Sequence, residues 1–156
     1  MTSEATTTRD PARKSITVAC SVETAFEVWT SRMGTWWPLS AGHSVAPDDA
    51  ETVVVEGRVG GRIFERTRQG VEHDWGEVLV WEPPTRLVHS WHPGYERARA
   101  TEVEVRFSDL GGGRTAVELE HRGWDRLSAE DVAARDGYDE GWVGVIARFA
   151  EAANSA

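Results

Sequence analysis

The stretch TEVEVRFSDLGGGRTAVELEHR, residues 101–122, decides the fold, because two alternating segments flank a run of three glycines. Apolar residues recur at every second position on both sides of the glycines, which is the pattern of an antiparallel hairpin with one buried face. We expect Phe107 to face Val117 across the turn. The same register places His121 opposite Val103, on the apolar face.

The segments upstream of this hairpin continue the same pattern. Because parallel neighbours would each need a crossover of about a dozen residues, a series of short strands predicts an antiparallel meander. Residues 15–20 also alternate, and Ser21 then caps an amphipathic helix at residues 22–30. Runs rich in β-branched and aromatic residues, separated by turns with glycine or proline, predict strands at residues 52–56, 62–67, 72–82, 86–92, 101–108 and 115–122.

The C-terminal segment carries an apolar stripe at helical spacing, which predicts a long helix over residues 138–153. Residues 128–135 predict a shorter helix, and Gly137 separates the two. A long amphipathic helix must cover an apolar surface, and the sheet is the only large partner. The expected fold class is therefore α+β, an antiparallel sheet packed on a long C-terminal helix, with small helices after the first strand. The stripe consists of Tyr138, Trp142, Val145, Ile146, Phe149 and Ala153.

Length, charge and cysteine content narrow the class of protein. The 156 residues suit one domain, which we expect at residues 15–154 behind a disordered N-terminal tail, residues 1–14. The formal net charge of −9, with acids and bases interspersed, argues against a nucleic-acid partner. Cys20 is the only cysteine, and no apolar run reaches the roughly 18 residues that a membrane span needs. These observations favour a cytoplasmic protein without membrane insertion.

Eight tryptophans indicate an aromatic interior. They either fill a core or wall a pocket, and each buried one needs an acceptor for its N–H group. On the strands at residues 72–82 and 86–92 both faces are apolar, so alternation does not select the inward face, and a β-bulge would reverse part of any assignment. We favour the face that holds the indoles, with His73, Trp75, Glu77, Leu79, Trp81, Leu87, His89 and Trp91.

This choice of face brings aromatic and titratable side chains into one inferred pocket, with residues 36 and 37 over its mouth. Glu77, His73 and His121 are the candidates for acid–base catalysis, because a carboxylate or imidazole in an apolar wall can have a shifted pKa. The alternative is that each is a hydrogen-bonded core group that pairs with an indole N–H or a tyrosine hydroxyl. The candidate ligand-binding residues are Trp36, Trp37, His73, Trp75, Glu77, His89, Trp91, His121, Tyr138 and Trp142.

No metal site and no cofactor are expected. His89 and His92 are three positions apart on a strand and therefore point to opposite faces. The chain lacks paired cysteines, the His-Glu-x-x-His spacing of zinc enzymes and the Gly-x-Ser-x-Gly turn of serine hydrolases.

Residues 57–94 carry a series of glycine, tryptophan and proline motifs, GRVGGRIFER, EHDWGEV, WEPPTRLV and WHP in that order. Together with Trp36-Trp37-Pro38 and the closing helix, this series resembles the activator-of-Hsp90-ATPase-homologue branch of the START/Bet v 1-like (SRPBCC) superfamily. The resemblance covers nearly all of residues 15–153. Its Gly-Gly and Pro-Pro-x-Arg-Leu-Val elements belong to turns and strand starts.

The resemblance implies a helix-grip fold, in which a curved antiparallel sheet wraps around a long C-terminal helix with an apolar cavity between them. It leaves three functions open, since fold likeness does not transfer a reaction. The first is binding of a hydrophobic or aromatic small molecule in the cavity. The second is a cyclase or hydrolase that uses the same cavity, and the third is a cochaperone-like or stress-response role with a chaperone partner. Whether the protein is an enzyme, and whether it is a monomer or a homodimer, stays open.

Overall fold

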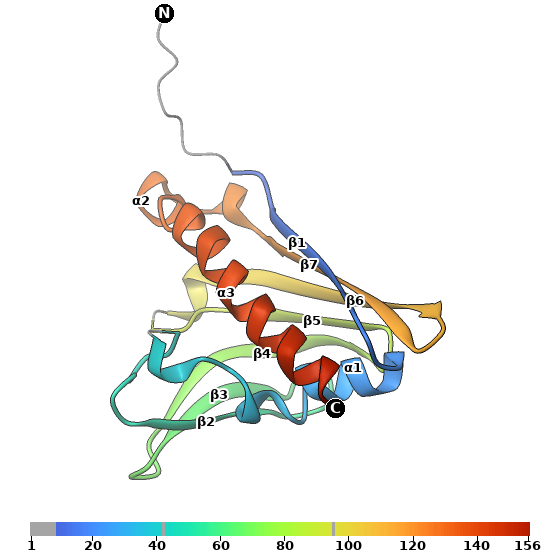
Figure 1. Cartoon of the computed structure of the whole chain (residues 1–156). Helices are drawn as coiled ribbons and strands as arrows, with labels where there is room; N and C mark the ends of the chain where they lie inside the picture. Colours follow the sequence, from blue (N-terminus) through green and yellow to red (C-terminus); the bar gives the residue numbers. More distant parts are fainter. Residues whose placement is uncertain (1–8, 42, 95) are drawn as a thin grey trace, which may run out of the picture.

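The protein folds as a curved antiparallel sheet wrapped around a long helix (Figure 1). The structure, a computed structural model, describes residues 9–41, 43–94 and 96–156. In these residues seven strands form one sheet in the order β1-β7-β6-β5-β4-β3-β2, and all neighbouring pairs are antiparallel. The strands are β1 (Ala12–Val18), β2 (Ala50–Val55), β3 (Arg62–Thr67), β4 (Glu72–Glu82), β5 (Arg86–Trp91), β6 (Thr101–Gly111) and β7 (Arg114–Arg122).

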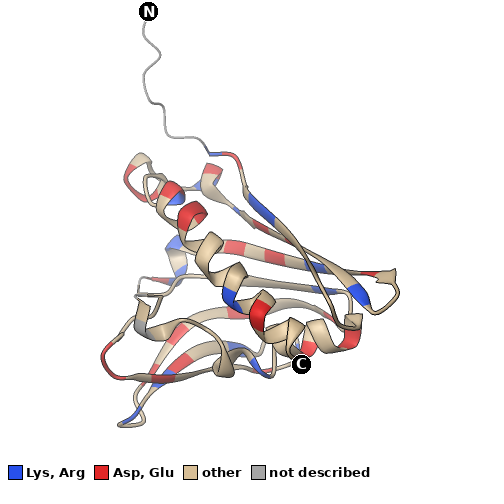
Figure 2. Ribbon diagram, viewed as in Figure 1, with Lys and Arg blue, Asp and Glu red and all other residues tan. Residues whose placement is uncertain are grey.

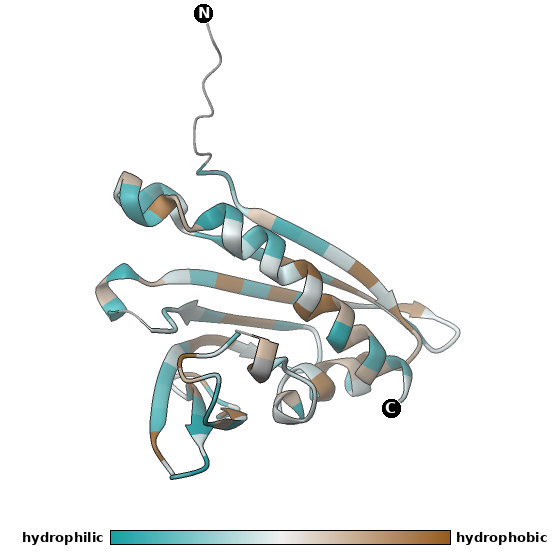
Figure 3. Ribbon diagram, turned by 60° about the vertical axis from the view of Figure 1, so that its left-hand side comes forward, coloured by the Kyte–Doolittle hydropathy of each residue, from teal (hydrophilic) through white to brown (hydrophobic). Residues whose placement is uncertain are grey.

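The hairpin of β6 and β7 has the predicted register. Phe107 lies opposite Val117, and Val103 lies opposite His121. All four side chains are buried, because this face of the hairpin packs into the core. Figure 3 shows hydrophobic and hydrophilic positions alternating along the strands, as a sheet with one buried face requires.

Short helices connect the sheet to its long helix. Helix α1 (Val22–Trp29) follows β1, and the hydroxyl of Ser21 accepts a hydrogen bond from the backbone N–H of Thr24 at its N-terminus. No helix in the described part of the chain is both long and apolar enough to cross a membrane. The remaining short helices are η1 (Met33–Thr35), η2 (Leu39–Ala41), η3 (Arg97–Arg99), η4 (Trp124–Arg126) and α2 (Ala129–Val132).

Helix α3 (Arg135–Asn154) crosses the concave face of the sheet and packs against β1 and α1 (Figure 1). The predicted stripe from Trp142 to Ala153 is buried along it. The helix begins at Arg135, before the predicted start, and runs through Gly137. A glycine inside a helix costs only about 1 kcal/mol relative to alanine, so it does not end the helix here.

Strand β1 begins at Ala12, so it includes the last three residues of the predicted tail, and Ala12 pairs with His121. Lys14 also forms an ion pair with Asp139 of α3, with Nζ and Oδ1 2.8 Å apart. The first strand is therefore longer than alternation alone indicates. Residues 1–8, which contain most of the predicted tail, lie outside the described residues.

The outer face of the sheet carries the charged side chains, and Figure 2 shows acidic and basic positions spread over the strands. Glu104 on this face is nevertheless only 5% exposed, because the guanidinium groups of Arg86 and Arg122 cover it. Burial opposes ionisation of Glu104, but the hydrogen bonds from Arg122 and Arg86 outweigh it and bring the pKa of its carboxyl group down to about 2. The outer face is thus an ion-pair network rather than a simple solvent face.

Candidate functional site

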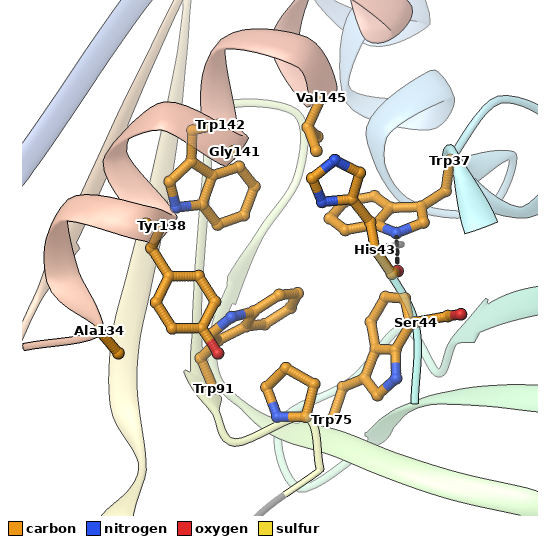
Figure 4. A pocket seen from close by; sticks show the side chains of 12 residues that line it. Trp37, His43, Ser44, Trp75, Trp91, Ala134, Tyr138, Gly141, Trp142 and Val145 are labelled. Atoms are coloured by element: carbon orange, nitrogen blue, oxygen red, sulfur yellow. Dashed lines mark hydrogen bonds between the residues drawn. The ribbon is translucent and has the colours of Figure 1, made fainter. Parts of the chain in front are cut away.

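A cavity of about 510 Å³ lies between the first half of α3, the ends of β4 and β5, and residues 37, 43 and 44 (Figure 4). Four indoles wall it, from Trp37, Trp75, Trp91 and Trp142. Their ring centroids lie 5.2 to 6.0 Å apart around the cluster, at tilted or edge-on angles that suit aromatic contacts. The other lining residues are His43, Ser44, Pro93, Ala134, Gly137, Tyr138, Gly141 and Val145.

Three of the four indole N–H groups in the wall donate to acceptors in the protein. Trp37 donates to the backbone oxygen of His43 at 2.8 Å, and Trp142 donates to Nδ1 of His121 at 3.0 Å. Trp75 donates to the carboxylate of Glu65 at 2.8 Å. These bonds fix the rings, so the cavity is walled by aromatic carbon in a defined arrangement.

Glu65 attaches the loop beside the cavity to the sheet. Its side chain is fully buried, and its two oxygens also accept hydrogen bonds from the backbone N–H groups of Val45 at 2.6 Å and Ala46 at 2.9 Å. One carboxylate from β3 therefore holds both the loop after Ser44 and the ring of Trp75. A buried carboxylate is stable only when it is hydrogen-bonded in this way.

Two register shifts in β4 decide which of its side chains face inward. One lies where β4 pairs with β3, next to Trp75, and the other lies between Val78 and Val80 where β4 pairs with β5. Trp75 and Val78 are therefore both buried although they are three residues apart. Gly76 sits at this irregularity, where a Cβ atom would come within 1.9 Å of the backbone oxygen of Ser90.

These shifts correct the predicted face of β4. Glu77 points away from the cavity, where it pairs with Arg97 at 3.1 Å, and Leu79 is 40% exposed. His73 lies by a separate polar hollow, beside His92, and not in the indole-walled cavity. The acid–base candidates Glu77, His73 and His121 are thus not brought to a common point.

His121 and His89 lie in the core behind the cavity. Both ring nitrogens of His121 are occupied, Nδ1 by Trp142 and Nε2 by the hydroxyl of Thr101 at 2.6 Å. Burial is the main reason that the pKa of His121 falls to about 3 and that of His89 to about 4. Nδ1 of His89 contacts the backbone oxygen of Ser90 at 2.9 Å. Both histidines match the alternative reading of hydrogen-bonded core groups.

Of the ten predicted ligand-binding residues, the structure brings Trp37, Trp75, Trp91, Tyr138 and Trp142 to the cavity. Trp36 lies behind Trp37, where it packs against Trp29 and Phe149 and donates to the backbone oxygen of Val28. It is therefore a core residue rather than part of a mouth.

Sequence reasoning missed His43 and its neighbour Gly141, both of which line the cavity. His43 belongs to the loose segment at residues 31–50, which has neither strand nor helix periodicity to assign a direction. Gly141 interrupts the apolar stripe of α3. It is the one feature of the sequence that could have indicated this contact, since a glycine on a helix face permits close approach of a neighbour. In the described residues, no group of three or more His, Cys, Asp or Glu side chains is placed to hold a metal ion.

Residues 19–154 match the family described as activator of Hsp90 ATPase homolog 1-like protein. The chain belongs to this family. Its match covers α1, the strands from β2 to β7, and α3, so the indole-walled cavity lies within the family domain. No curated protein matches the chain.

Solved structures of other proteins share the fold. The anthrahydroquino-gamma-pyrone synthase Txn09, complexed with SUM, is 38% identical, with a TM-score of 0.55 over 80% of this chain and 84% of that one. CalC from Micromonospora echinospora, a self-sacrificing resistance protein, is 26% identical, with a TM-score of 0.67 over 94% and 96%. An Hsp90 activator from Plasmodium falciparum is 18% identical, with a TM-score of 0.52 over 72% of each chain, and shares the fold alone.

Substitution Glu65→Gln tests the attachment of the loop. A glutamine has one acceptor oxygen and an NH2 group that faces donors, so we expect the free energy of unfolding to fall by about 1–3 kcal/mol. The emission maximum of tryptophan fluorescence should also shift, because the negative charge beside the indole of Trp75 is removed. Urea unfolding checks the first effect. The exposed Glu51→Gln change on β2 is the control and should stay within about 0.5 kcal/mol of the parent protein. Equal stability of both variants would contradict the role given to Glu65.

Two of the buried histidines, His89 and His121, predict acid sensitivity. Because their pKa values in the folded protein lie below the ordinary value of 6.5, the unfolded chain binds more protons as the pH falls. Their contribution to stability is complete above pH 6.5 and is lost progressively down to about pH 4 for His89 and about pH 3 for His121. We expect about 2 kcal/mol less stability per histidine at pH 5 than at pH 7, measured by urea unfolding.

His121→Asn should reduce the slope of stability against pH over this range, whatever its effect on stability at pH 7. His73→Asn, outside the core, is the control and should keep the slope of the parent protein. An unchanged slope in His121→Asn would show that this imidazole titrates normally in the folded protein.

Proposed function

We propose that this protein binds a flat, largely apolar aromatic molecule in the cavity between α3 and the sheet. The observation that carries the proposal is the convergence of four indoles on one space of about 510 Å³, within the range of small-molecule sites. Indole faces stack on aromatic rings and gain more than area burial alone provides. A chain of aliphatic carbons would forgo that contribution.

The comparison with Txn09 supports an aromatic ligand. That protein is named as an anthrahydroquino-gamma-pyrone synthase, so its name specifies a fused aromatic product, and it is 38% identical to this chain over most of both lengths. The Hsp90 activator shares only the fold, at 18% identity, and supports a chaperone role less. A small-molecule ligand is therefore favoured over a chaperone partner.

Quenching of tryptophan fluorescence tests the proposal. We expect uncharged 9,10-anthraquinone to quench the emission in a saturable way, and the uncharged aliphatic alcohol 1-hexadecanol to bind more weakly. Trp91→Phe, which shrinks one wall, should weaken anthraquinone binding by about threefold to tenfold, since an aromatic contact contributes about 0.5–1.5 kcal/mol. Trp81→Phe is the control, because Trp81 packs on Phe26 away from the cavity. Equal losses in both variants, or tighter binding of hexadecanol, would contradict the proposal.

A synthase reaction in the same cavity is a second candidate, favoured by the identity with Txn09. A fused gamma-pyrone forms when the phenol oxygen of an ortho-hydroxyaryl 1,3-diketone attacks the distal carbonyl carbon. The new C–O bond closes the ring, and the carbonyl oxygen leaves as water. We expect the protein to accelerate conversion of 1-(2-hydroxyphenyl)-3-phenylpropane-1,3-dione to flavone, followed by chromatography. Conversion at the rate of buffer alone would leave binding as the function.

A further inference from the structure

The polar groups of the cavity are few and unevenly placed. Three of its four indole N–H groups are already bonded to His43 O, Glu65 and His121. The hydroxyl of Ser44 donates to the backbone oxygen of Leu39 and points away from the cavity in Figure 4. The polar side chains that face the space are therefore those of His43 and Tyr138, from opposite sides of it (Figure 4).

The imidazole of His43, which is half-buried, differs from that of His121 in having unused nitrogens. Its ring forms no hydrogen bond with any residue that the structure describes, although its backbone oxygen accepts from Trp37. Burial lowers the pKa of His43, so the ring is neutral at neutral pH and offers one N–H donor and one nitrogen acceptor. An imidazole nitrogen is a stronger hydrogen-bond acceptor than a phenol or serine oxygen.

Gly141 leaves room for this imidazole to pack against α3. A Cβ atom at position 141 would lie 3.3 Å from Cε1 of His43 and 3.9 Å from its Nδ1. The ring therefore rests against the bare backbone of α3 at Gly141. This contact restricts the ring and holds its nitrogens at the edge of the cavity.

The cavity provides no charge for an ionised ligand. None of its described lining residues is Lys, Arg, Asp or Glu. Moving a phenolate, carboxylate or sulfonate from water into such a site without a counter-ion carries a desolvation cost of several kcal/mol. A ligand that is neutral when bound is therefore favoured over its anion.

We propose that His43 accepts a hydrogen bond from a phenolic hydroxyl at the edge of an uncharged polycyclic aromatic ligand, and that Gly141 holds the imidazole in position for it. The cavity thereby selects hydroxylated rings over both unsubstituted and anionic rings of the same size. This inference rests on the proposed function and adds the chemical class of the ligand and the residue that recognises it.

Three probes with one ring system test the inference: 9,10-anthraquinone, 2-hydroxyanthraquinone and anthraquinone-2-sulfonate. Dissociation constants come from tryptophan quenching at pH 7. We expect the hydroxyl to tighten binding by about threefold to tenfold over anthraquinone, the range of one net hydrogen bond. The sulfonate should bind at least about tenfold more weakly than anthraquinone, because its charge is not compensated. The visible absorption of bound 2-hydroxyanthraquinone should be that of the phenol, even at a pH where the free dye is a phenolate.

Two variants assign the preference to His43. In His43→Phe the gain from the hydroxyl, taken as the ratio of the dissociation constants of anthraquinone and 2-hydroxyanthraquinone, should be lost. Gly141→Ala should reduce the same ratio by displacing the ring. Alanine favours a helix by about 1 kcal/mol over glycine, so the second variant keeps its fold. His73→Phe, outside the cavity, is the matched control and should keep all three affinities.

The outcomes distinguish failure of this inference from failure of the proposed function on which it rests. If none of the three probes binds, both the proposed function and this inference are wrong. If anthraquinone binds but the hydroxyl gain persists in His43→Phe, the proposed function stands and the role of His43 is wrong. Loss of anthraquinone binding in His43→Phe would assign the residue to the shape of the wall instead, and tightest binding of the sulfonate would overturn the choice of an uncharged ligand.

Discussion

Every tryptophan that this fold buries brings one N–H group that needs an acceptor, and this requirement organises the interior. Backbone oxygens satisfy Trp36, Trp37 and Trp124. Side chains satisfy Trp75 and Trp142, and each of these two acceptors also bonds a second group. Glu65 bonds Trp75 and also holds the loop at residues 45–46, and His121 bonds Trp142 and also joins it to β6 through Thr101. The wall of the cavity and the attachment of its covering loop thus depend on the same hydrogen bonds.

The sequence predicts those parts of the fold in which apolar residues repeat at one constant spacing. The hairpin of β6 and β7 alternates without interruption, so its register follows from the position of one pair, Phe107 and Val117. The stripe of α3 is equally regular and identifies the buried face. Strand β4 is different, because its two register shifts reverse the alternation between Trp75 and Trp81, both of which contact the core. Its alternation therefore misplaces Glu77 and Leu79, although it places Trp75 correctly.

The candidate site was less predictable, because two of its main residues carry no periodic signal. His43 lies in a segment without regular structure, where only tertiary contacts decide its direction. Glu65 lies on an inward position of β3, but a carboxylate ordinarily indicates a solvent-facing residue. Its burial depends on three donors that come from residues 45, 46 and 75, and such a coincidence is visible only once the chain is folded.

Residue type alone does not identify the histidine that we propose to bind the ligand. What distinguishes it is that its ring nitrogens are not hydrogen-bonded within the protein. His121 has the larger pKa shift and the more enclosed position, yet both its nitrogens are bonded within the protein, so a ligand would have to displace Trp142 or Thr101 to reach it. The pKa of His43 is lowered less than that of His121, but its ring has an unused nitrogen acceptor at the edge of the cavity. Solved structures that are 18% and 38% identical to this chain share its fold. A fold retained over that range does not select a ligand, whereas an unsatisfied polar group in an aromatic wall does.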